Sequence, residues 1–485
     1  MHSMVFLGRE RMPVFPLSQR SNRLLLLFLV MVGLALRAYH YGRDRAVWHD
    51  EAGLLLTASS RSYSDLFLGR LDYHQAAPPL YVCTLKTTGL LLGDGSLALR
   101  LPSFLASCAA LVLFAFMAWR TLSPGSAAWA TLWFAVSEQL LWHASEAKVY
   151  SIDVLAAVAV LAIPSCRGLG TTRNQLVAYS LLAPILMLSS YPASFLFAGL
   201  LLAYLPEVFK RSDSTTRLAY TVLATVTAAI VLWLVKVPIR AQHDAEIHSC
   251  WVAMMPNWHK PSTLPFWFIA SPFEVCRYSC KPLGQILACF LVPGSIVLWR
   301  GGEQTRIRFM ATSIFLALAA ACCHLYPFGG ARIMAYAAPS ILLVAAAGVP
   351  VVLRWVWSRS RLASAAPVAL LLVPAAASLS LTVFTWTDVG IPDAVAYVED
   401  QRRSEDLIVG NDVTHQYYFR RLGSGFHLLD ESPVPSPTSN RLWVVMTASL
   451  SQAEREQMAA QFVPPGWRLC CEREFMFTTV VLFSR

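Results

Sequence analysis

The chain has 485 residues, of which 56% are hydrophobic and 14% are charged, and its mean hydropathy is +0.50. Because an average soluble domain carries about 25% charged residues, this composition excludes a soluble enzyme, a disordered chain and a fibrous protein. It favours a polytopic membrane protein.

The net charge of +10 is unevenly distributed along the chain. From Asp388 to Arg485 there are 13 acidic and 9 basic residues, whereas the first 387 residues carry a net charge of +14. An excess of basic residues in the apolar part follows the positive-inside rule of membrane proteins. No run of Lys and Arg with interleaved aromatic residues occurs, so we expect no nucleic-acid partner.

Eleven apolar runs approach the length of a membrane span, about 17–25 residues. They lie near residues 24–41, 101–119, 127–142, 152–166, 175–190, 193–207, 218–236, 283–299, 309–326, 333–353 and 363–384. A twelfth run, 79–92, is short and contains Lys86. If it crossed the membrane, nearly all short basic loops would lie outside, so we interpret it as a juxtamembrane or re-entrant helix.

The predicted fold is therefore mostly α, with about eleven transmembrane helices in a domain of residues 1–387 and a cytoplasmic N-terminus. Residues 42–100 and 237–282 form long outward loops, and the second is rich in Trp and Phe, which suits a segment along the headgroups.

The tail, residues 388–485, has the composition of a soluble protein and lies outside in this topology. Helical patterns at 391–403 and 412–422, an apolar run at 407–409 and strand-like runs at 441–447 and 476–483 predict a small external α/β domain. A further helical stretch is expected at 451–461, and Pro433, Pro435 and Pro437 mark an exposed turn. No phosphate loop or catalytic triad occurs there, so we expect a lid or docking domain.

The eleven cysteines show no CxxC pair and no zinc-ligand spacing, and we predict no metal site from them. Cys250, Cys276 and Cys280 share one polar stretch and could pair in an oxidising compartment. The alternative is that they are free thiols.

Candidate catalytic residues come directly after the first span. Asp50 and Glu51 are adjacent carboxylates at a membrane boundary, where they could act as a general base or as a metal ligand. The alternative is that they are solvated charges of the loop. His74, later in the same loop, could act in acid/base chemistry or contact phosphate, or could be an ordinary loop histidine.

Candidate binding residues lie at two further outward positions. Glu146, Lys148 and Tyr150 follow the third span, where Glu146 and Lys148 could instead form a local ion pair. Arg332 precedes the tenth span and suits a phosphate bidentately, although a basic side chain there could also extend to the interface.

In order and in position, these motifs resemble the GT-C membrane glycosyltransferases, which include the protein O-mannosyltransferases and the transferases that move aminoarabinose onto lipid A. The similar segments cover residues 24–384 and are Trp48–Ala52, His74–Tyr81, Arg100–Ser103, Ser145–Tyr150, Tyr191 and Arg332. Two departures occur: Gln75-Ala76-Ala77 separate His74 from the proline pair, and Lys148 stands where the family usually has Arg.

The resemblance implies a multi-pass protein of the inner membrane with its active site on the external face. The donor would be a polyprenyl-phosphate sugar, the acceptor a lipid, glycan or protein, and membrane lipid a further partner. Asp50 would be the base of an inverting transfer, supported by Glu51, while Lys148 and Arg332 would neutralise the leaving phosphate. No cofactor is certain, and a divalent cation is an alternative that the motifs leave open.

The other interpretation of the sequence is a transporter or flippase of lipid-linked or small-molecule substrates. Such a protein should carry its substrate residues in the middle of the spans, with broken helices and internal repeats. Here the ionisable residues gather in outward loops, which favours the enzyme.

Overall fold

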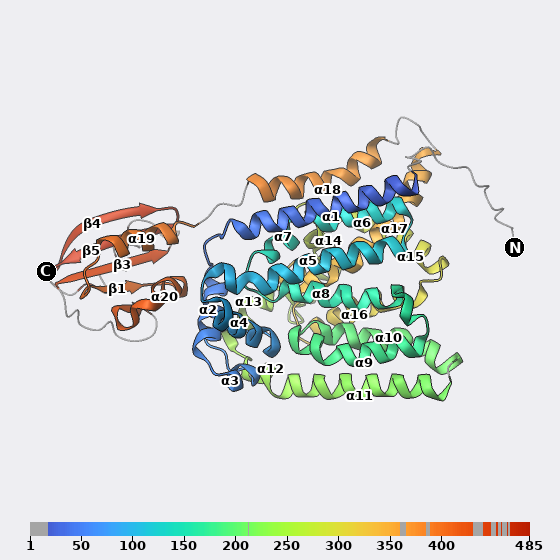
Figure 1. The fold of residues 1–485 in the computed structure, drawn as a ribbon, viewed down its shortest axis with the longest axis horizontal. Coiled ribbons are helices and arrows are strands. Elements are labelled where there is room, and N and C mark those ends of the chain that lie inside the picture. Colours follow the sequence, from blue (N-terminus) through green and yellow to red (C-terminus); the bar gives the residue numbers. More distant parts are fainter. Residues whose placement is uncertain are drawn as a thin grey trace.

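The protein forms a helical bundle that is followed by a small α/β domain (Figure 1). The computed structural model describes residues 18–485 except 212, 359–364, 385–388, 430–439, 448–452, 454–456, 458–462 and 464–465.

Each of the eleven predicted spans overlaps a long helix of the bundle, and the run at 127–142 also reaches into the short helix α7 (Glu138–Ala144). The long helices are α1 (Gln19–Gly42), α5 (Ser96–Thr121), α6 (Pro124–Val136), α8 (Tyr150–Ala162), α9 (Thr172–Ser189), α10 (Ala193–Arg211), α11 (Ser214–Lys236), α15 (Ala288–Arg300), α16 (Gln304–Cys322), α17 (Ala338–Trp357) and α18 (Ala365–Phe384). In the described part of the chain, six helices are long and apolar enough to cross a membrane. A helix pair that includes α15 and bends by 107° would add a seventh. The chain is therefore a mostly α membrane protein, and the number of eleven spans stays a prediction.

Six shorter helices lie in the segments predicted as the two long outward loops. The first loop contains α2 (His49–Ser60), α3 (Tyr63–Phe67) and α4 (Pro79–Leu92), and the second contains α12 (Pro238–Ala241), α13 (Ala245–Trp251) and α14 (Leu264–Ser279). Helix α4 confirms the short helix predicted at 79–92, and Pro79 occupies its first turn, where proline is favoured.

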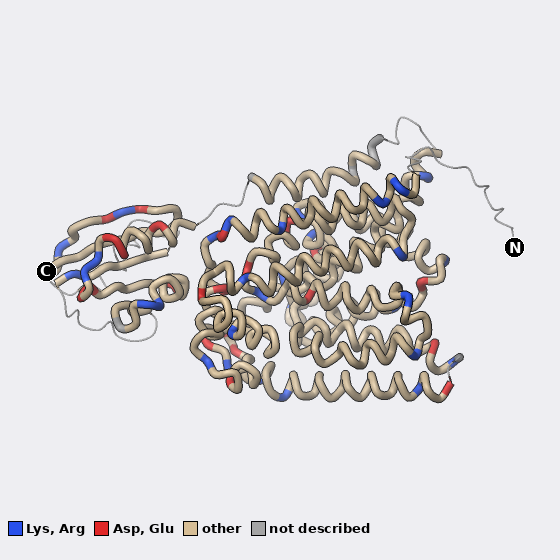
Figure 2. The backbone as a smooth tube through the Cα atoms, viewed as in Figure 1, with Lys and Arg blue, Asp and Glu red and all other residues tan. Residues whose placement is uncertain are grey.

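Most charged residues of the bundle lie near its two ends, and few lie along the length between them (Figure 2). The C-terminal ends of α5, α10, α15 and α17 and the turn before α9 lie at one end, and α2 lies at the other (Figure 1). These segments carry Arg120, Lys210, Arg300, Arg354 and Arg167. We call the two ends the Arg300 end and the Asp50 end. The basic loops thus share one side of the bundle, as the charge count predicted.

Helices α15 and α17 pack with their backbones in direct contact. A Cβ atom at Gly294 would lie 1.8 Å from the carbonyl oxygen of Val344, and one at Gly348 would lie 2.3 Å from that of Phe290. Glycine at these two positions therefore allows the close approach, as small residues do between membrane helices.

Helix α1 lies at the edge of the bundle and is attached to it through Arg37. This side chain is fully buried and donates to Ser107 Oγ at 2.9 Å and to the carbonyl oxygens of Gly33 and Ala135 at 3.0 and 3.3 Å. The buried guanidinium thus has acceptors on α5 and α6.

The C-terminal domain contains a five-stranded sheet with the order β2-β1-β3-β5-β4. Its elements are α19 (Ile391–Gln401), β1 (Leu407–Gly410), α20 (Val413–Phe419), β2 (Phe426–Leu428), β3 (Arg441–Thr447), β4 (Arg468–Phe475) and β5 (Thr478–Ser484). Strand β1 pairs in parallel with β2 and β3, and β5 is antiparallel to β3 and β4. The α/β prediction is confirmed, although β2 and β4 were not foreseen. Most of the stretch 451–461, the prolines 433–437 and Asp388 lie outside the described residues.

Candidate active site

The Asp50 end of the bundle brings together two residues that are 282 positions apart in the sequence. Asp50 lies in the first turn of α2, where the helix dipole favours a carboxylate. Arg332 begins the 3-10 helix that leads into α17. Their side chains form an ion pair and are 25% and 29% exposed, so both remain accessible from outside.

Aromatic rings surround the Arg332 guanidinium. Its Cζ atom lies 4.9 Å from the ring centre of Trp48, 5.7 Å from that of Trp251 and 5.8 Å from that of Tyr150. Such contacts hold a cation in place. Its Nε is buried and has no hydrogen-bond partner among the described residues, so the group keeps an unused donor.

A cavity of about 410 Å³ lies beside this cation. Its lining includes Trp48, Glu138, Gln139, Trp142, His143, Glu146, Trp251, Tyr278, Lys281 and Arg332.

Glu146 is the buried carboxylate of this cavity. Its Oε2 accepts from Trp48 Nε1 and Trp142 Nε1, both at 3.2 Å, and its Oε1 lies 2.6 Å from His143 Nδ1. Burial raises the pKa of Glu146, but hydrogen bonding to His143 and the charges of Arg332 and Lys148 outweigh it and lower the pKa below its usual value. Glu146 is therefore an anion that orients the tryptophans around the cavity.

A larger groove of about 1040 Å³ adjoins the cavity, and both are lined by Gly330. Residues 252–260 and the side chains of Phe266, Trp267 and Phe328 form much of its wall. Phe266 is 76% exposed, so this wall continues into an apolar outer surface. Arg332 thus lines the cavity two residues after Gly330, which lines both the cavity and the groove.

Glu51 differs from its neighbour Asp50 because it is completely buried. Its two oxygens accept from Arg100 Nε and Nη2, both at 2.7 Å, and Oε1 also accepts from the backbone N–H of Ala147 at 2.7 Å. This geometry joins α2, α5 and the loop that carries Glu146 and Lys148. It supports an orienting role for Glu51.

Lys148 is buried close to Asp50, and its Nζ donates to Gln75 Oε1 at 2.7 Å. Burial lowers the pKa of Lys148 to about 8, even though the charge of Asp50 raises it. The side chain is therefore a cation at neutral pH and loses its proton as the pH rises through about 8.

Of the predicted binding residues, only Glu146 and Arg332 line the cavity, and His74 and Tyr191 have other partners. The Tyr191 hydroxyl is within 3.0 Å of Ala77 O and 2.9 Å of Gln242 Oε1, and so supports the segment that carries Gln75. His74 forms ion pairs with Asp244 and Glu246 at the surface. The substrate-binding roles of these two residues stay predictions.

The sequence did not single out several residues that line the cavity. Glu138 and Gln139 interrupt an apolar run, and this signal could have identified them. Trp142 and His143 stand beside Glu146 in the sequence, whereas nothing distinguished Tyr278 or Lys281 from other loop residues.

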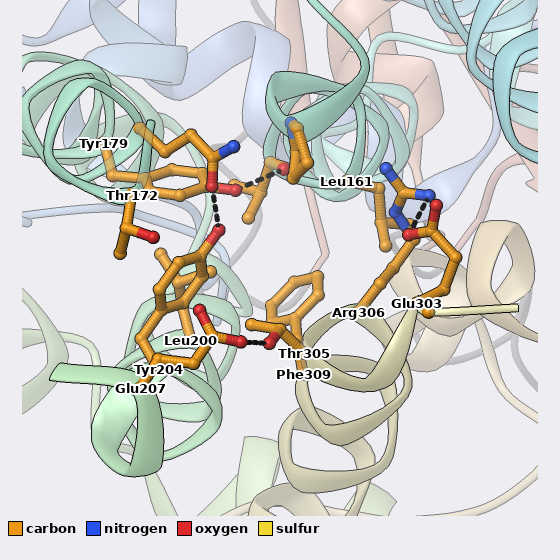
Figure 3. A pocket seen from close by; sticks show the side chains of 14 residues that line it. Leu161, Thr172, Tyr179, Leu200, Tyr204, Glu207, Glu303, Thr305, Arg306 and Phe309 are labelled. Atoms are coloured by element: carbon orange, nitrogen blue, oxygen red, sulfur yellow. Dashed lines mark hydrogen bonds and ion pairs between the residues drawn. The ribbon is translucent and has the colours of Figure 1, made fainter. Parts of the chain in front are cut away.

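A second cavity, of about 200 Å³, lies at the Arg300 end (Figure 3). Its polar side chains bind one another: Tyr204 donates to Gln175 at 2.5 Å, Thr305 donates to Glu207, and Arg306 pairs with Glu303 at 2.7 Å. We interpret this network as a structural junction of α9, α10 and α16, because these groups already have partners.

The described residues contain no group of three or more His, Cys, Asp and Glu side chains that could hold a metal ion. All eleven cysteines fall in the described chain and are unpaired, with Cys276 and Cys280 buried and Cys250 exposed.

Comparison with solved structures identifies the fold. No family model and no curated protein matches the sequence. ArnT from Cupriavidus metallidurans, a lipid A aminoarabinose transferase, is similar with a TM-score of 0.56 at 14% identity, over 96% of this chain and 98% of that chain. Its complex with undecaprenyl phosphate gives a TM-score of 0.55 at 13% identity, over 94% and 97%. The oligosaccharyltransferase from Archaeoglobus fulgidus, in complex with Zn and sulfate, is similar with a TM-score of 0.50 at 11% identity, over 90% of this chain and 69% of that chain. The chain therefore has the GT-C fold of membrane glycosyltransferases.

Proposed function

We propose that the protein is a membrane glycosyltransferase that moves a sugar from a polyprenyl-phosphate donor to an acceptor lipid, glycan or protein. The observation that carries this proposal is the Asp50–Arg332 pair, which joins a carboxylate and a cation beside the cavity and its apolar groove. The reaction takes place at the Asp50 end, on the external face of the inner membrane.

The donor fits the two parts of this site. The apolar groove suits a polyprenyl chain, and Arg332 suits its phosphate, since a guanidinium presents several donors to phosphate oxygens. Lys148 supplies a second positive charge, and the rings of Trp48, Trp142 and Trp251 offer flat apolar faces to a sugar. A GT-C relative, ArnT, has been solved with undecaprenyl phosphate bound, which supports this donor class.

Asp50 is the general base in this mechanism. It accepts the proton of the acceptor hydroxyl, whose oxygen attacks the anomeric carbon from the face opposite the phosphate. The bond between that carbon and the phosphate oxygen breaks, the configuration inverts, and polyprenyl phosphate leaves. Arg332 and Lys148 stabilise the negative charge that develops on the phosphate. On donor binding, the phosphate takes the place of Asp50 on Arg332 and frees the base.

A divalent cation shared by Asp50 and the donor phosphate is the alternative role for this carboxylate. If a chelator abolishes activity and a divalent cation restores it, Asp50 is assigned as a metal ligand and not as the base. Activity that a chelator leaves unchanged supports the base.

The proposal is tested with the purified full-length protein, a panel of polyprenyl-phosphate sugars and no nucleotide sugar. With the donor that supports turnover, Asp50→Asn should lower kcat by about 10²–10⁴-fold, which is the usual contribution of general base catalysis. Donor affinity should survive in this variant and fall in Arg332→Ala. Wild-type turnover in Asp50→Asn would contradict the mechanism, and an Arg332→Ala variant with full donor affinity would contradict the phosphate site.

A further inference from the structure

The C-terminal domain contacts the helix that carries Asp50. Val413 and Tyr417 of α20 are buried in the same apolar cluster as Val47 and Leu54, which belong to α2 and the segment before it. The hydroxyl of Tyr418 accepts the backbone N–H of Val47 at 2.9 Å. The domain thus packs against the segment from which Asp50 projects.

The first turn of α2 has no cap of its own. The residue at its N-cap position is Trp48, whose side chain makes no capping hydrogen bond. Glu51 fixes the buried side of this turn through Arg100, but uncapped backbone N–H groups leave its exposed side, with His49 and Asp50, dependent on other contacts. Because Asp50 is the second residue of α2, any movement of this turn displaces its carboxylate.

One polar contact from the C-terminal domain reaches this turn. His49 Nδ1 lies 3.0 Å from Asp412 Oδ2. The other oxygen of Asp412 accepts the backbone N–H of Thr414 at 2.7 Å, so α20 holds this carboxylate in place.

The charge states favour this contact. The hydrogen bond to Asp412 raises the pKa of His49, and the charges of Asp412 and Asp50 act in the same direction, whereas burial and Lys148 oppose it. Burial raises the pKa of Asp412, but its hydrogen bonds to His49 and Thr414 lower it well below the usual range. Asp412 is therefore an anion beside a histidine that readily takes up a proton.

A second polar contact between the two parts lies on a different segment. Arg420 and Arg421 pair with Asp94, in the connection between α4 and α5, at 3.1 and 2.9 Å. These ion pairs hold the domain against the bundle without touching α2, and they provide a matched control.

We infer that Asp412 of the C-terminal domain is a positioning residue for Asp50, which it fixes through His49 at the start of α2. The inference rests on the proposed role of Asp50 as the base. It makes the C-terminal domain part of the catalytic apparatus, although no residue of this domain touches the reacting atoms.

Hydrogen–deuterium exchange of the full-length protein tests the contact without any substrate. Amides of residues 49–53 should exchange at least threefold faster in Asp412→Asn and in His49→Gln than in the wild type. The double variant should exchange no faster than either single variant, because both remove one contact. Asp94→Asn should leave these amides as they are in the wild type.

Turnover tests the consequence, with the polyprenyl-phosphate sugar that the wild type uses. A displaced reacting group can cost as much as about 10²-fold, so kcat should fall about 10-fold or more in Asp412→Asn while donor affinity is unchanged. Asp94→Asn should keep kcat within about twofold of the wild type.

Unchanged hydrogen–deuterium exchange of residues 49–53 in Asp412→Asn would overturn the inference. An equal loss of kcat in Asp94→Asn and Asp412→Asn would also overturn it, because kcat would then depend on docking of the domain in general and not on this contact. If no donor supports turnover by the wild type, the proposed function fails, and the exchange result still decides whether Asp412 orders α2.

Discussion

At the scale of single residues, two adjacent carboxylates have opposite surroundings. Asp50 is partly exposed and pairs with Arg332 beside the cavity, whereas Glu51 is buried against Arg100 and the N–H of Ala147. Their position in the first turn of α2 points neighbouring side chains in different directions. The structure thus places an accessible carboxylate and a buried one at adjacent positions.

Glu51→Gln should therefore act on stability. Breaking a buried ion pair leaves an uncompensated charge and costs about 3–5 kcal/mol, so we expect a clear fall in Tm, measured by thermal unfolding of the purified protein. Asp50→Asn serves as the control and should shift Tm much less, because its side chain is accessible. Equal shifts in the two variants would contradict this division of roles.

Lys148 should set the alkaline limit of activity. Its pKa is lowered to about 8 by burial, so the cation is present below that pH and is lost as the pH rises through it. The value of kcat/KM, which reports the free enzyme, should accordingly fall above about pH 8. In Lys148→Arg the charge persists at all accessible pH values, and the decline should move up by more than one pH unit.

A control for this pH profile is Lys86→Arg, because Lys86 does not line the cavity. Its Nζ donates instead to the carbonyl oxygens of Ala58 and Ser59 on α2. Its profile should match that of the wild type. A decline that stays near pH 8 in Lys148→Arg would assign it to another group.

At the scale of elements, the contact between α15 and α17 depends on two glycines that face the opposite backbone. Close backbone approach gives these helices a packing surface with little side-chain volume. This contact places the start of α17, and with it Arg332, next to α14 and the groove.

Gly348→Ala should weaken this contact. The new Cβ would meet the carbonyl oxygen of Phe290 at 2.3 Å, and overpacking of this kind costs about 1–3 kcal/mol. We expect a lower Tm in detergent, while Gly125→Ala, where nothing lies within 4 Å, should leave Tm unchanged. A Gly348→Ala variant as stable as the wild type would show that the helices can separate at no cost.

The elements show where prediction from sequence succeeds and where it stops. Apolar runs located the helices of the bundle, because hydrophobicity alone decides which segments leave water. Strand β4 was missed because most of its side chains are exposed and do not alternate. The pairing of Asp50 with Arg332 and the contact of His49 with Asp412 join residues hundreds of positions apart, and no local pattern encodes such contacts.

At the scale of the whole molecule, the C-terminal domain and Asp50 lie at one end of the bundle, and the basic connections lie at the other (Figures 1 and 2). Under the positive-inside rule, the Arg300 end is cytoplasmic. This arrangement brings the C-terminal domain to α2, the helix that carries the proposed base.

The orientation can be tested with fused reporters. An export-dependent phosphatase fused after Arg485 should be active, and a fluorescent protein that matures only in the cytoplasm should be dark there. The same two reporters inserted between Gly301 and Gly302 should give the reverse pattern. A fluorescent fusion after Arg485 would overturn the topology and with it the external active site.

Arg37 also bears on how the protein is made. A lone guanidinium in hydrocarbon is costly, and the acceptors of Arg37 outside its own helix lie on α5 and α6, which are synthesised later. Newly made α1 therefore lacks these acceptors until α5 and α6 have been synthesised. We expect the guanidinium to stay near the interface until then, and α1 to reach its final packing only together with these two helices.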